Sequence, residues 1–161
     1  MNCRLCELVE NMKVIKEPGK IWTKEIDVED SMGVKRNLIL TGRLYEFPDN
    51  KREIIRYMDD NFIFVNPVKD YSQNYADIII GLPKEHVTNM QFSEKFEMFS
   101  NLYKRAMELV KHQYDVPGSE IGARIMMNYE KKYATVVDHS HIQIILTQGT
   151  MTLIPEVVRK Y

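Results

Sequence analysis

An excess of charge of either sign is absent from this sequence. Of its 161 residues, 22 are Lys or Arg and 23 are Asp or Glu, which gives a net charge of −1 with neutral histidines. Proteins that bind nucleic acid through its phosphates usually carry a basic excess, so nucleic acid is not an expected partner. A small anionic ligand remains compatible with this balance, because a pocket can be positive on a neutral protein.

Long hydrophobic runs are also absent. No stretch of about 18 apolar residues occurs, so no membrane-spanning helix is predicted. The first residues, MNCRLCELVENM, lack the apolar middle of a signal peptide, and we therefore expect a cytoplasmic chain. Cysteine is scarce: the only two are Cys3 and Cys6, and no disulfide is expected between them in a reducing compartment.

What is present is the composition of a globular protein, with 44% hydrophobic and 28% charged residues. A chain of this length can bury a core without disulfides. No internal repeat, low-complexity tract or linker interrupts it, so we predict a single domain over residues 1–161.

Strand-forming runs dominate the coarse pattern. A short helix is predicted in CRLCELVENMKVI, followed by two strands with turn signals at Asp30–Gly33 and Pro48–Asn50. The next run, EIIRYMDDNFIFVNP, reads as a hairpin around Asp59–Asn61. The predicted strands outside this hairpin are GKIWTKEIDVE, KRNLILTGRLYEF, YADIIIGLP, GARIMMNYE and HSHIQIIL.

One long helix is predicted from about Ser93 to His112, with Ser93 as its N-cap. Apolar residues recur at helical spacing and form one stripe. The stripe consists of Phe92, Phe96, Phe99, Tyr103, Ala106 and Val110. A helix packed on a mostly antiparallel sheet is the expected architecture, which is an α+β fold.

The pair Cys3-x-x-Cys6 indicates a zinc site, a redox pair or a chance occurrence. A redox pair would follow a strand and open a helix, and nothing precedes this one. Zinc requires four ligands, so two more would have to come from the four histidines. Those are His86, His112, His139 and His141. His112 suits the carbonyl end of the long helix, and the residues around His86 alone favour an exposed loop histidine.

The stretch VVDHSHIQIIL sets His139, His141 and Gln143 at alternate positions of an apolar run. In a strand these three side chains share one face. Unpaired buried imidazoles are costly, so both histidines need partners.

At this point the chain resembles a known family. HSHIQII is similar to the histidine-triad (HIT) motif, H-φ-H-φ-H-φ-φ, with glutamine in place of the third histidine. That replacement is typical of the nucleotidylyltransferase branch, which includes galactose-phosphate uridylyltransferase and diadenosine tetraphosphate phosphorylase. IIRYMDDNFIFVNP and ADIIIGLPKEHVTNM resemble the family's hairpin and its strand with P-K-x-H, and Asn128 lies eleven residues before His139 as the family asparagine does. The resemblance covers residues 59–146 and the cysteine pair.

The resemblance implies a HIT-like α+β fold and a metal site. Zinc-bearing members use a C-x-x-C pair, a histidine after the P-x-x-H strand, and the first motif histidine. Carried over, the zinc ligands are Cys3, Cys6, His86 and His139. With four protein ligands the site is closed, so its expected role is structural.

The resemblance also implies a catalytic arrangement. His141 becomes the nucleophile that attacks the α-phosphorus of a nucleotide and forms a covalent nucleotidyl-histidine. Gln143 donates its amide N–H to a phosphate oxygen, and Asn128 donates a second hydrogen bond. Asn66 is similar to the family's ribose- or phosphate-contacting asparagine, although a polar residue before Pro67 can equally cap a strand.

The chain departs from the family upstream of the motif. Val136 stands where the family commonly has a serine that contacts the phosphate or leaving group, and Tyr133 and Ala134 replace the usual glycines. Thr135, or a lysine in the preceding EKK, could compensate for the lost donor. These changes leave the nucleophile in place, but they remove a donor that the family uses to contact the phosphate or the leaving group.

Three functions therefore follow from the sequence. The favoured one is a nucleotidylyltransferase or nucleotide hydrolase acting on a nucleotide, nucleotide sugar, dinucleoside polyphosphate, or nucleoside phosphoramidate or sulfate. The second is a nucleotide-binding zinc protein of the same fold with little or no turnover. The third is a structural zinc domain that uses all its histidines for metal. Family members of this size pair as homodimers, so a homodimer is expected.

Overall fold

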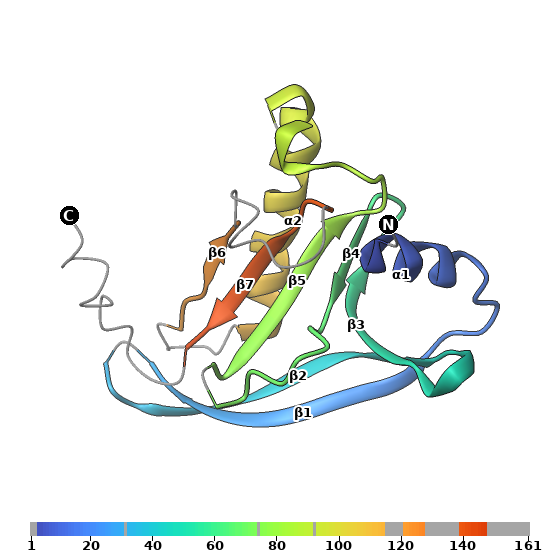
Figure 1. Ribbon diagram of the computed structural model, residues 1–161. Coiled ribbons are helices and arrows are strands. Elements are labelled where there is room, and N and C mark those ends of the chain that lie inside the picture. The colour runs from blue at the N-terminus through green and yellow to red at the C-terminus, as the bar shows by residue number, and fades with distance from the viewer. Residues whose placement is uncertain are drawn as a thin grey trace.

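The computed structural model describes residues 3–30, 32–73, 75–91, 93–114, 121–127 and 139–147 (Figure 1). Its centre is one antiparallel sheet of seven strands in the order β1-β2-β3-β4-β5-β7-β6. The strands are β1 (Lys20–Glu29), β2 (Lys35–Glu46), β3 (Arg52–Met58), β4 (Phe62–Val65), β5 (Asp77–Pro83), β6 (Arg124–Met126) and β7 (Ile142–Leu146). The α+β class predicted from the sequence is confirmed.

The long ribbon of β1 and β2 runs across one end of the other strands (Figure 1). Its turn is built around Asp30, whose Oδ1 accepts hydrogen bonds from the backbone N–H groups of Met32 and Val34. The other carboxylate oxygen pairs with Arg36 at 3.0 Å. Gly33 has a φ of 76°, a conformation that favours glycine and that the predicted turn required.

The two helices, α1 (Arg4–Lys13) and α2 (Phe96–Tyr114), pack on opposite faces of the sheet (Figure 1). Strand β4 shows the division most clearly, because alternate side chains of a strand point to opposite faces. Phe62 and Phe64 join the core cluster beneath α2, whereas Ile63 and Val65 pack with α1. The α1 cluster is completed by Leu5, Leu8, Val9, Met12, Ile55 and Leu82.

Helix α2 differs from its predicted form in two respects. It begins at Phe96, after a 3-10 turn over Ser93–Lys95, and ends at Tyr114 instead of His112. The predicted stripe is only partly buried: Phe99 and Ala106 are in the core, but Phe96 is 70% exposed. Leucines fill the core row instead, so the buried apolar residues of α2 are Phe99, Leu102, Ala106, Leu109 and Tyr114. Phe92 lies outside the described residues.

A buried polar network joins the carboxyl end of α2 to the sheet. The guanidinium of Arg56 donates two hydrogen bonds to Asp77, both at 2.9 Å, and one to Gln113 at 2.8 Å. The hydroxyl of Tyr114 donates to the same carboxylate at 2.7 Å. Strands β3 and β5 are thereby held to the last turn of α2.

Among the helices in the described ranges, none combines the length and the apolar character that crossing a bilayer requires.

Candidate functional site

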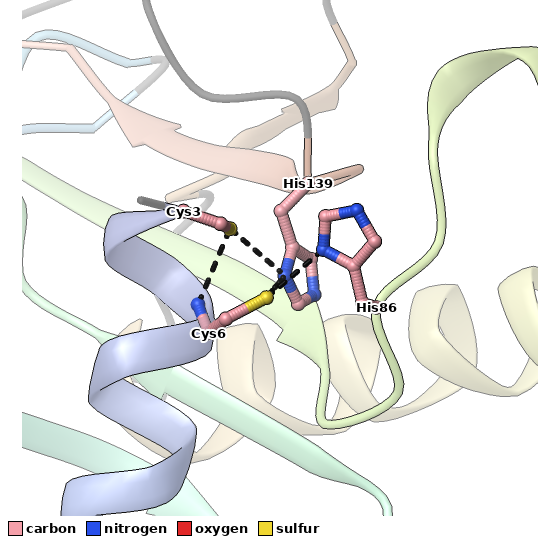
Figure 2. A group of neighbouring side chains, drawn as sticks. All are labelled: Cys3, Cys6, His86 and His139. Atoms are coloured by element: carbon pink, nitrogen blue, oxygen red, sulfur yellow. Dashed lines mark hydrogen bonds between the residues drawn. The ribbon is translucent and has the colours of Figure 1, made fainter. Parts of the chain in front are cut away.

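Four potential metal ligands from distant parts of the chain lie together at one end of the sheet (Figure 2). Cys3 is the N-cap of α1, and Cys6 stands one helical turn later, so both sulfurs point to the same side. His86 follows β5, and His139 precedes β7. The neighbouring ends of β5 and β7 bring the two imidazoles to the start of α1.

The distances among these four groups fit a tetrahedral ion. Nδ1 of His139 lies 3.6 Å from the sulfur of Cys3 and 3.4 Å from that of Cys6, and Nδ1 of His86 lies 2.9 Å from the Cys6 sulfur. All four ligand atoms are within 4.8 Å of one another. Ligands around a tetrahedral zinc ion are separated by about 3.6 Å on the basis of ordinary Zn–S and Zn–N bond lengths. The donor set of two thiols and two imidazoles suits zinc.

The orientation of His139 is fixed on its other side. Its Nε2 lies 2.8 Å from the carbonyl oxygen of Pro83, and a carbonyl can only accept, so Nε2 carries the proton. Nδ1 therefore turns its lone pair toward the two sulfurs. A hydrogen bond from the remote ring nitrogen to a carbonyl is the usual support of a metal-binding histidine.

Burial shifts the pKa of two members of this cluster, Cys6 and His139. It raises the pKa of the Cys6 thiol to about 11, with further contributions from the hydrogen bond and charge of Cys3 and the charge of Glu10. It also lowers the pKa of His139, so that this imidazole is neutral over a wider range. A bound metal ion would instead lower the pKa of the Cys6 thiol, because thiolate is the form that binds metal.

His141 is buried, with 8% of its surface exposed, and is held by the backbone of its own motif. Its Nδ1 lies 2.9 Å from the carbonyl oxygen of His139, so Nδ1 carries the proton and Nε2 keeps its lone pair. Within the described residues Nε2 makes no hydrogen bond. His139 thus has two functions: its ring faces the sulfurs, and its carbonyl orients His141.

The two histidines precede β7 and do not lie in it, which corrects the predicted strand. Pairing between β5 and β7 ends at Gly81 and Ile142. Before that point the backbone N–H of Ser140 donates instead to the carbonyl of Val87, at 2.6 Å. The chain therefore leaves the sheet and carries His139 toward α1.

Gln143 lies within β7, opposite Ile80 of β5 and Met126 of β6. Ile142 points into the core beneath α2, so Gln143, the next residue of the strand, points to the opposite face. His141 precedes β7, so strand alternation does not extend to it, and the common face of His141 and Gln143 stays a prediction.

Asn66 lies in a different environment. Its Oδ1 accepts a hydrogen bond from Arg56 at 3.2 Å, and its backbone N–H donates to Ile54. Because Val65 packs with α1, Asn66 belongs to the face of the buried network, opposite that of Gln143. This placement favours the alternative in which Asn66 caps the end of β4, and a contact with nucleotide stays a prediction.

Several predicted positions cannot be located. Asn128 and Thr135 lie outside the described residues, as does the segment in which the chain departs from the family pattern, including Val136.

Ser140 is a site residue that the sequence reasoning missed. It is buried, and its hydroxyl donates to Oδ1 of Asn89 at 2.6 Å. The signal was available, because serine occupies a position that the histidine-triad pattern fills with an apolar side chain.

Comparisons with known proteins support the fold. No model of a protein family matches the sequence, and no curated protein matches it. Among solved structures, the chain is similar to a histidine triad protein from Clostridium difficile, with 14% identity, 91% of this chain and 90% of that chain covered, and a TM-score of 0.53.

Two HIT family hydrolases also match. The one from Legionella pneumophila Philadelphia 1 is 22% identical, with 63% of this chain and 86% of that chain covered and a TM-score of 0.49. The one from Clostridium thermocellum is 19% identical, with 58% of this chain and 78% of that chain covered and a TM-score of 0.47. At these identities a likeness concerns architecture alone. The match to the Clostridium difficile protein, with the sheet described above, confirms the fold predicted from the sequence: this chain has the histidine-triad fold.

Proposed function

We propose that this protein transfers or hydrolyses nucleoside monophosphate groups through a covalent nucleotidyl-histidine on His141. The observation that carries the proposal is the 2.9 Å hydrogen bond from Nδ1 of His141 to the His139 carbonyl. It selects the tautomer in which the lone pair of a neutral imidazole lies on Nε2, which is the form that a nucleophilic histidine needs.

In the first step, Nε2 attacks the α-phosphorus in line with the leaving group. A bond forms between Nε2 and phosphorus, and the bond from phosphorus to the leaving group breaks with its electron pair on the departing atom. The ring gains positive charge in this step. The His139 carbonyl, which accepts a hydrogen bond from Nδ1–H, stabilises that charge.

In the second step, an oxygen of the acceptor attacks the same phosphorus and the bond to Nε2 breaks. Water as acceptor gives hydrolysis, and a phosphate or sugar phosphate gives transfer. Gln143, two residues after His141, would supply an amide N–H for a phosphate oxygen. An amide cannot shuttle a proton as a histidine would, which favours transfer over rapid hydrolysis.

We further propose that Cys3, Cys6, His86 and His139 hold a structural zinc ion. When bound, zinc supplies a cross-link between the start of α1 and the segments after β5 and before β7. His141 is not a member of the four-residue cluster, which argues against a domain that uses all its histidines for metal.

The histidine-triad fold and the similarity to two HIT family hydrolases support nucleotide chemistry in general. The branch with glutamine in the third position, the nucleotide sugar or dinucleoside polyphosphate donors, and the homodimer remain parts of this proposal. The second candidate is a nucleotide-binding protein without turnover, which the valine at position 136 favours because valine cannot donate a hydrogen bond to a leaving group.

The test is incubation with nucleotide donors labelled at the α-phosphate. We expect label on the protein that is lost in acid, and no label on His141→Ala. His112→Ala, an exposed histidine on α2, is the matched control and should label like the wild type. Nucleotide binding without label or product would support the second candidate. Loss of metal from His141→Ala would instead indicate that His141 is a zinc ligand.

A further inference from the structure

Arg124 is an arginine on the same face of the sheet as Gln143. It is the first residue of β6 and lies directly opposite Ile145 of β7, while Met126 lies opposite Gln143. Paired residues of an antiparallel ladder point to the same face, so Arg124 and Gln143 are diagonal neighbours with Cα atoms about 7–8 Å apart. His141 lies two positions before Gln143, directly ahead of the first residue of β7.

The guanidinium of Arg124 lacks a counter-ion among the described residues. Its Nε is buried without a hydrogen-bond partner, and none of the ion pairs in the described ranges includes it. The side chains on this face of the three adjoining strands offer no carboxylate. They are Ile78, Ile80, Leu82, Gln143, Ile145 and Met126.

Arg124 is half-buried, and its buried Nε lacks a hydrogen-bond partner, which is unfavourable unless a ligand supplies one. The fully buried Arg56 illustrates the contrast, because it is matched by the carboxylate of Asp77. The planar guanidinium of an arginine suits phosphate or carboxylate.

We propose that Arg124 binds an anionic group of the substrate that lies beyond the phosphate attacked by His141. The identity of that substrate rests on the proposed function. Ile145, which pairs with Arg124 in the strand ladder, lies four positions after His141, a distance of roughly 14 Å along an extended chain. The arginine is therefore too far along the face to be a second ligand of the attacked phosphorus, and Gln143 lies between the two.

This assignment predicts selectivity among donors. A donor whose leaving group carries further phosphates reaches Arg124, whereas a nucleoside phosphoramidate with an uncharged leaving group does not. Arg124 would thus determine specificity without taking part in the displacement at phosphorus.

The first test measures binding of inorganic tripolyphosphate by calorimetry. We expect Arg124→Gln to weaken binding about 10- to 100-fold, as expected for the loss of a charge-assisted hydrogen bond. Arg52→Gln is the matched control: Arg52 is 69% exposed and paired with Glu46, and its loss should change binding less than about twofold. Equal affinities of wild type and Arg124→Gln, or no binding by the wild type, would overturn the proposal.

The second test compares a dinucleoside tetraphosphate with a phosphoramidate of the same nucleoside. Arg124→Gln should lower kcat/KM for the first donor at least about tenfold and leave the second within about twofold. Equal losses for both donors would contradict the assignment. Tripolyphosphate binding needs no turnover, so the two proposals can fail separately. If the wild type is not labelled at His141 but Arg124→Gln still weakens tripolyphosphate binding, only the proposed function is contradicted.

Thermal unfolding separates ligand binding from a structural role. Removing an uncompensated charge should leave the unfolding midpoint of Arg124→Gln unchanged or raise it. A large fall in the midpoint, or a changed oligomeric state with unchanged tripolyphosphate binding, would show that Arg124 is paired within the protein or with a second copy of it.

Discussion

Ser140 holds the short backbone segment on which both motif histidines depend. Its N–H donates to Val87 and its hydroxyl donates to Asn89, so two hydrogen bonds tie the segment to the loop after β5. The same loop carries His86. The residue between His139 and His141 is therefore fixed to this loop by its backbone and by its side chain.

We predict that Ser140→Ala lowers kcat more than it changes KM. Loss of the hydroxyl releases the segment and leaves Asn89 Oδ1 without this donor, at a cost of about 1–3 kcal/mol in folding free energy. The rate of His141 labelling should fall about 3- to 10-fold, which corresponds to one neutral hydrogen bond. Zinc content should not change. Ser100→Ala, on the exposed side of α2, serves as the control, and equal labelling rates in both variants would refute the positioning role.

At the scale of elements, the Arg56 network fastens α2 to the sheet. Arg56 is fully buried in its side chain, lies over the ring of Trp22 at 5.2 Å, and is matched by Asp77. Gln113 adds hydrogen bonds to the backbone and hydroxyl of Thr41 in β2. Burial raises the pKa of Tyr114 well above its usual value, and the charge of Asp77 adds to the effect, so the tyrosine stays a donor.

We predict that Asp77→Asn destabilises the protein by about 3–5 kcal/mol, because it leaves the buried Arg56 charge uncompensated. Tyr114→Phe removes one hydrogen bond to the same carboxylate and should cost about 1–2 kcal/mol. Urea unfolding followed by far-ultraviolet circular dichroism measures both. A loss for Asp77→Asn no greater than that for Tyr114→Phe would mean that the charge of Asp77 is not needed to balance Arg56.

Most helices and strands could be predicted from the sequence. Apolar runs bounded by turn signals predicted the hairpin of β3 and β4 and the buried β5, because local pattern dictates these strands. The side of α2 that is buried could not be predicted from the sequence. Phe96 and Leu102 are both strongly hydrophobic, and packing against the sheet, which spacing does not encode, places Leu102 in the core and leaves Phe96 exposed.

The site was predictable to a similar degree. Cys3, Cys6, His86 and His139 followed from the family pattern, and they converge in space. The protonation of His141 and the place of Asn66 depend on the His139 carbonyl and on Arg56, which are contacts across the fold that spacing does not encode.

At the scale of the whole molecule, the four potential metal ligands connect α1 to the far end of the chain. Cys3 and His139, which face each other, are 136 positions apart in the sequence. Apart from this cluster, α1 is held mainly by its apolar face against β3, β4 and β5. The cluster therefore supplements one hydrophobic contact of α1 with a polar one at its first turn.

We predict that protein purified without added metal contains about one zinc per chain. Removing the ion with a chelator should lower the unfolding midpoint and slow the labelling of His141, because the orientation of His139 is shared by both sites. Cys6→Ser should be less stable and insensitive to the chelator. Well-folded protein with almost no metal by elemental analysis would contradict the zinc assignment.

The cysteine–histidine cluster also has a consequence for biosynthesis. The ribosome makes Cys6 133 residues before His139, so two thiols exist long before their last partner is synthesised. Nascent chains would hold the cysteine pair exposed to oxidants and competing metals until His139 is added. The cluster can therefore be completed only after the strands from β1 to β6 have been synthesised.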